Sequence, residues 1–134
     1  MKKKLITICM AICMLFTIGF SSNAASRISG TYSATPNHMT YNGSQTVSGD
    51  CKYYYLRLDS VSFNGLPTNT FVSNSYVHLS ICKNNSEVAS RNFTSRYGYT
   101  GSYSQSSGTY QLGVSSNAGV GFTCGAKWNA QEVL

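Results

Sequence analysis

Apolar and polar residues alternate with a period of two along most of the chain beyond residue 25. The longest run covers 51–63 and places Tyr54, Leu56 and Leu58 on one face. A second clear run covers 76–82. Because successive side chains of a strand point to opposite faces, this period predicts half-buried β-strands. No stretch of comparable length has the period of an amphipathic helix.

Shorter alternating runs complete the pattern, and turn residues separate them. We expect further strands over 28–35, 45–48, 87–94, 97–103, 109–114 and 120–128. Residues 83–86 are typical of a turn between two hairpin strands, and we expect 115–119 to be the hairpin loop between the last two strands. About seven to eight short strands without helices between them predict an all-β fold. The expected architecture is a single small antiparallel β-sandwich, Ig-like or jelly-roll-like, with a small barrel as the alternative.

The first 25 residues have the three parts of a secretory signal peptide. Three lysines at 2–4 precede an apolar run at 5–20, and small residues at 21–25 follow it. The apolar run is shorter than the ~20 residues that a membrane-spanning helix needs. We therefore expect cleavage after Ala25, a secreted, extracellular protein, and one β-sandwich domain over residues 26–134.

Removal of the leader changes the charge of the chain. The full chain has ten Lys and Arg residues and four Asp and Glu residues, which gives a net charge of +6. Three of the lysines belong to the leader, so its removal lowers the net charge to +3. The remaining basic residues are spread along the sequence instead of forming a polybasic patch. This distribution argues against a nucleic-acid partner.

Three cysteines remain outside the leader, namely Cys51, Cys82 and Cys124. If 51–63 and 76–82 are antiparallel neighbours, one register places Cys51 opposite Cys82 and also brings the apolar faces of both strands together. Secretion permits disulfides, so we predict a Cys51–Cys82 disulfide. For Cys124 a buried thiol is favoured; the alternatives are an exposed thiol that links two chains and a Cys82–Cys124 disulfide.

The sequence offers little for catalysis or metal binding. Only four acidic residues are available for acid–base chemistry, and no nucleophile-elbow motif is present. The cysteines form no C-x-x-C motif, and His38 and His78 lack the spacing of metal ligands. We therefore expect a protein that is not an enzyme and that holds neither a metal nor a cofactor.

Tyrosines are the more suggestive feature. The predicted register places Tyr53, Tyr55, Arg57 and Tyr76 on the face opposite the apolar core, together with His78. A row of aromatic rings beside polar donors suits a sugar-stacking surface. The alternative is that cross-strand Tyr pairs only stabilise the sheet.

A second group of tyrosines lies amid Ser and Gly, and comprises Tyr97, Tyr99, Tyr103 and Tyr110. Tyr with Ser and Gly is typical of adaptable binding loops, although an edge hairpin of ordinary strand formers would have the same composition. The segment 97–123 could also be taken as a membrane-entering hairpin. Its outward face is too weakly apolar for lipid, so we do not expect a membrane interaction.

Three hypotheses follow from these observations. The first is a secreted, tyrosine-rich binding module that recognises a glycan, a cell-wall component or a protein at a cell surface. The second is a secreted antagonist, bacteriocin-like or pore-forming. The third is an extracellular assembly subunit joined through Cys124 or an exposed strand edge.

Overall fold

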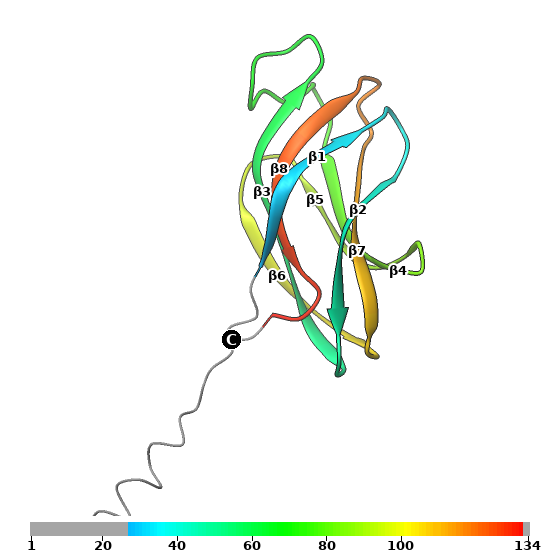
Figure 1. The fold of residues 1–134 in the computed structure, drawn as a ribbon. Helices are drawn as coiled ribbons and strands as arrows, with labels where there is room; N and C mark the ends of the chain where they lie inside the picture. Colours follow the sequence, from blue (N-terminus) through cyan, green and yellow to red (C-terminus); the bar gives the residue numbers. More distant parts are fainter. Residues whose placement is uncertain (1–26, 133–134) are drawn as a thin grey trace, which may run out of the picture.

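The computed structural model describes residues 27–132, which form eight β-strands in two antiparallel four-stranded sheets (Figure 1). The strands are β1 (Ile28–Ala34), β2 (Thr40–Val47), β3 (Cys51–Phe63), β4 (Val77–Lys83), β5 (Ser86–Phe93), β6 (Gly98–Gln105), β7 (Gly108–Ser116) and β8 (Phe122–Asn129). The predicted signal peptide falls outside the described residues. Within 27–132, no helix is long and apolar enough to cross a membrane.

The strand order reveals how the chain is rolled up. One sheet has the order β1-β8-β3-β6 and the other has the order β2-β7-β4-β5. Each strand thus pairs with the strand at the mirrored place in the chain: β1 with β8, β2 with β7, β3 with β6 and β4 with β5. The domain is one long hairpin whose successive strand pairs enter the two sheets alternately. This is the jelly-roll form of the β-sandwich, which confirms the predicted fold class.

The tip of this long hairpin is the turn between β4 and β5. Asn84 and Asn85 both have positive φ values, 52° and 59°. Two such residues define the type I′ turn that matches the twist of a hairpin, and Asn tolerates this conformation better than most residues. The predicted hairpin of 76–82 with 87–94 is therefore confirmed.

The core lies between the two sheets and is closed by large apolar side chains from both. Its largest fully buried members are Trp128, Tyr110, Phe63, Phe93, Leu56 and Leu58. The indole Nε1 of Trp128 donates a hydrogen bond to the hydroxyl of Tyr32 at 3.1 Å, so the polar atom of this buried ring is satisfied. The apolar residues of the alternating sequence pattern thus point into this core, and the polar residues between them point to one of the two outer faces.

Strand β2 begins earlier than the sequence indicates. The pattern predicted 45–48, whereas the strand covers Thr40–Val47. Its pairing with β7 shifts between Asn42 and Gln45, and Gly43 within this bulge has a φ of 62°. An extra residue reverses the alternation locally, which explains why the first half of the strand has no period-two signal.

The predicted pairing of 51–63 with 76–82 is wrong. Strand β3 pairs with β6 and β8, whereas β4 belongs to the other sheet and pairs with β5 and β7. Cys51 lies in the core, and Cys82 lies on the outward-facing side of β4. Both are free thiols in the structure, so the disulfide prediction rested on a register that does not form. The apolar faces of β3 and β4 do meet in the core, but they meet across the sandwich and not as neighbours in one sheet.

The loop at 115–119 also differs from the prediction. Strands β7 and β8 lie in different sheets, so this segment crosses from one layer to the other and is not a hairpin loop. Cys124, on β8, is buried at 1% exposure, which agrees with the favoured interpretation as a buried thiol. Burial raises the pKa of this thiol to about 12, so it stays protonated and unreactive at neutral pH.

Candidate functional site

The tyrosines singled out from the sequence separate into three environments. Tyr53 and Tyr55 project with Arg57 from the outer side of β3, as their spacing predicts. Tyr76 precedes β4 and belongs to the opposite face of the sandwich. The predicted single row of aromatic residues is therefore divided between two sheets.

The tyrosines of the β5–β6 region take part in packing. Tyr99 and Tyr103 approach the ring of Tyr54, with centroid separations of 5.9 Å and 5.4 Å. Tyr97 packs on Phe93 at 4.7 Å. The hydroxyls of Tyr97 and Tyr103 donate to backbone carbonyls, at 3.2 Å and 2.6 Å respectively. These partly buried rings seal the edge of the core, so we leave them out of the candidate sites.

Tyr55 is an outward residue that a neighbour covers. The guanidinium of Arg27 lies 3.8 Å from the centroid of the Tyr55 ring, and Tyr55 is only 7% exposed. Such a stack is a cation–π contact. Arg27 also forms an ion pair with the buried carboxylate of Glu132. Tyr55 is therefore a support for Arg27 and does not present a free ring to a ligand.

Two basic residues stand side by side on the same outer face. Arg57 on β3 is directly opposite Lys127 on β8 in the strand register. Both side chains are exposed. Arg57 pairs with Asp59 through Nε at 2.6 Å, whereas no acidic group of the described chain pairs with Lys127. Directly opposed like charges destabilise a sheet. Asp59 offsets the charge of Arg57, whereas the charge of Lys127 is not offset by any acidic group of the described residues.

These residues form a basic face, which we define as Arg27, Arg57 and Lys127 together with Tyr53. The Tyr53 side chain is among the few large apolar groups that are exposed, at 38%. Arg96 lies at the margin, where its guanidinium donates to the carbonyl of Asp59 at 3.4 Å. Four of the seven basic residues within 27–132 therefore gather here, against only Asp59 and Glu132.

The outer face of the second sheet carries a pocket of about 400 Å³. Its lining includes Asn37, Met39, Tyr76, His78, Ser115 and Asn117. Ser116 and Asn117 hold Tyr76 in place through its backbone. The amide of Tyr76 donates to Asn117 Oδ1 at 2.8 Å, and its carbonyl accepts from the hydroxyl of Ser116 at 2.6 Å.

The imidazole of His78 is fixed from both sides. Nδ1 lies 2.5 Å from Asn92 Oδ1, and Nε2 lies 2.6 Å from Glu87 Oε2. Glu87 also accepts a hydrogen bond from the hydroxyl of Ser90 at 2.6 Å. Partial burial acts to raise the pKa of Glu87, but the hydrogen bonds from His78 and Ser90 outweigh it and hold that pKa below its ordinary value.

This arrangement determines what His78 can do chemically. Asn92 Oδ1 and Glu87 Oε2 occupy the two ring nitrogens of His78, so neither nitrogen is left as a hydrogen-bond partner for the hydroxyl of Ser115, its cross-strand neighbour. His78 therefore links β4 to β5 through its contacts with Asn92 and Glu87. The described residues also contain no group of three or more His, Cys, Asp or Glu side chains that could hold a metal ion.

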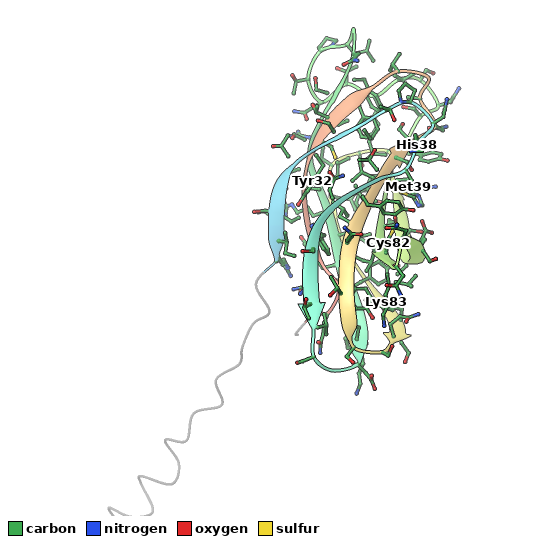
Figure 2. All side chains as sticks on the ribbon, turned by 45° about the vertical axis from the view of Figure 1, so that its right-hand side comes forward. Tyr32, His38, Met39, Cys82 and Lys83 are labelled. Atoms are coloured by element: carbon green, nitrogen blue, oxygen red, sulfur yellow. The ribbon has the colours of Figure 1, made fainter. Side chains whose placement is uncertain are left out.

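A small covered layer lies beside the pocket. Ser80 and Cys82 face outward from β4 yet are buried, and the hydroxyl of Ser80 lies 3.8 Å from the sulfur of Met39. A Cβ at Gly113 would come within 2.8 Å of both sulfurs, Met39 Sδ and Cys82 Sγ. In Figure 2 Met39 and Cys82 lie on the same side of the sandwich. Glycine at 113 therefore lets Met39 close over β7 and β4.

Sequence reasoning missed several residues of both sites. Arg27 and Lys127 join the basic face only because β8 lies beside β3 and β1 lies beside β8, which the wrong register concealed. Asn37 and Asn117 reach the pocket from loops that carry no periodic signal. Strand parity correctly placed Arg57 and Tyr53 outward, since parity depends only on local alternation.

Comparison of the chain with protein-family models, with curated proteins and with solved structures finds no match in any of the three.

Proposed function

We propose that this protein is a non-catalytic binding module that recognises an acidic glycan at a cell surface through its basic face. The observation that carries the proposal is the direct cross-strand pairing of Arg57 with Lys127. Evolution of a sheet for stability alone disfavours like charges in this position. An anionic ligand that lies across β3 and β8 would neutralise Lys127 and share Arg57 with Asp59.

The neighbouring side chains support a glycan as the anionic partner. Tyr53 supplies an exposed ring against which the C–H face of a sugar can stack, and its hydroxyl can hydrogen-bond. Arg27 is held above Tyr55 and is half exposed, at 45%, so its position is fixed before a ligand arrives. A site with preformed geometry loses less entropy on binding.

The distribution of charge favours a sparsely charged polymer. The face carries three basic side chains and Arg96 at its margin, a number too small for the many phosphate contacts on which nucleic-acid binding depends. Carboxylated sugars place their charges further apart and alternate them with neutral hydroxyls. The jelly roll also occurs in lectin domains, although a fold alone does not assign a function.

Affinity electrophoresis in gels that contain polygalacturonate tests the proposal, with neutral dextran as the reference polymer. We expect retardation by polygalacturonate only, and weakening of the interaction by about five- to tenfold in Arg57→Gln and in Lys127→Gln, since each removes one charged contact. Arg91→Gln is the matched control, because it removes an exposed charge from β5.

The comparison among these variants decides the outcome. Equal weakening by all three substitutions would mean that net charge alone attracts the polymer, and would overturn the proposal. Equal retardation of the unaltered protein by dextran and by polygalacturonate would overturn the acidic character of the ligand. Tyr53→Ala is expected to weaken binding as well, with no change in the dependence on salt.

A further inference from the structure

The pocket beside Tyr76 has a different chemistry from the basic face. Its lining is made of amide, hydroxyl, thioether and aromatic groups. His78 is the only lining residue that can carry a charge, and Glu87 and Asn92 occupy both of its ring nitrogens. An anion in the pocket would therefore find no free cationic donor there.

The pocket is also held rigidly. The Tyr76 backbone is clamped by Ser116 and Asn117, and Asn117 also donates to the carbonyl of Asn74 at 3.2 Å. The His78 ring is braced by β5. The backbone of Tyr76 and the ring of His78 are thus fixed without a ligand. Preorganised groups of this kind are typical of small-molecule sites.

We propose that this pocket is a second binding site, independent of the basic face, and that it takes one neutral sugar residue. The ring of Tyr76 is the stacking surface for the sugar C–H groups. Asn37 and Ser115 supply amide and hydroxyl groups for the sugar hydroxyls, and Met39 closes the apolar side. The volume of about 400 Å³ lies within the range of small-molecule sites.

The two sites lie on opposite outer faces of the sandwich. Basic-face residues belong to the sheet β1-β8-β3-β6, and the pocket lies over the sheet β2-β7-β4-β5. The core separates them, so substitutions at one site leave the other intact. This separation makes the second site testable even if the basic face binds nothing.

Titration of ¹⁵N-labelled protein with three neutral probes tests the proposal. The probes are the methyl β-glycosides of glucose, galactose and N-acetylglucosamine, each at millimolar concentration. At least one is expected to shift the backbone amide signals of Tyr76, His78 and Ser115. Tyr76→Phe should keep the affinity, whereas Tyr76→Ala should lower it about tenfold, because only the ring is needed for stacking.

One control variant and one alternative variant complete the test. Tyr53→Ala removes an exposed ring from the opposite face and should leave the titration unchanged. If Tyr76→Ala does not fold, Ser115→Phe fills the pocket from β7 and should abolish the shifts. Absence of shifts at the pocket with all three glycosides, or equal loss in Tyr53→Ala and Tyr76→Ala, would overturn the proposal.

Discussion

Individual side chains on the two outer faces are fixed by specific partners. Tyr55 faces outward but lies beneath Arg27, and His78 faces outward but is tied to Glu87 and Asn92. Strand parity alone predicts both as exposed residues. Parity reports the direction of a side chain, and only the fold shows which distant residue covers it. For this reason the sequence correctly predicted which side chains of β3 face outward. It did not predict that Arg27 covers Tyr55 and so removes its ring from the surface open to a ligand.

The contact between Glu87 and His78 predicts a pH-dependent contribution to stability. Because the folded-state pKa of Glu87 lies below its ordinary value of 4.5, its carboxylate stabilises the fold above that value, and the stabilisation is lost as the pH falls through the folded pKa. We expect Glu87→Gln to lower the free energy of unfolding by about 0.5–1 kcal/mol at pH 7, since the pair is partly exposed.

Urea denaturation at several pH values measures this effect. The difference between Glu87→Gln and the unaltered protein should shrink as the pH falls below 4.5. A difference that stays constant between pH 7 and pH 3 would show that the carboxylate charge is not what stabilises the contact. Asp59→Asn is a useful comparison, because Asp59 pairs with an arginine that is half exposed on the opposite face.

Strand β7 shows how one residue type determines the surface of an element. Glycine at 113 leaves space for the sulfurs of Met39 and Cys82, and this allows a covered layer on an outer face. The sequence pattern identified the strand itself, because its inward residues alternate regularly. Nothing in the pattern marked Gly113, since the side chains that need its space come from the β1–β2 loop and from β4.

Gly113→Ala should destabilise the protein. The new methyl group would lie within 2.8 Å of Met39 Sδ and Cys82 Sγ. Overpacking of this kind costs about 1–3 kcal/mol, and the movement of Met39 should expose Cys82 to thiol reagents. Gly119→Ala is the matched control, because a Cβ there meets no atom within 4 Å. Thermal unfolding together with the alkylation rate of Cys82 measures both effects.

At the scale of the whole molecule, the sequence predicted the two-layer architecture but not the strand order. Eight alternating segments predicted a sandwich, and the turn at Asn84-Asn85 predicted the one hairpin that the structure confirms. The remaining pairs join strands that are distant in the sequence, such as β1 with β8. Local alternation is identical for many pairings of such strands, so the cysteine and apolar patterns could agree on a register that the fold does not use.

The ion pair of Arg27 with Glu132 joins the residue just before the first strand, β1, to the segment just after the last strand, β8. Glu132 is 8% exposed, so its carboxylate depends on this partner. We expect Arg27→Ala to lower the free energy of unfolding by about 1–3 kcal/mol, because it leaves a buried charge without compensation and uncovers Tyr55. Arg57→Ala, which breaks a more exposed pair, should destabilise the protein less than Arg27→Ala does. Fluorescence of the single tryptophan, Trp128, during urea denaturation reports both values.

The same contact brings together two residues that are 105 positions apart in the chain. A short linker could therefore bridge residues 27 and 132, and new ends could be opened at the exposed β4–β5 turn, which gives a circularly permuted protein with the same strand pairs. Because residues 27 and 132 are in contact, the domain could also be inserted into a surface loop of a host protein without separating the two ends of that loop. It would then display its two outer faces on opposite sides of a single attachment point.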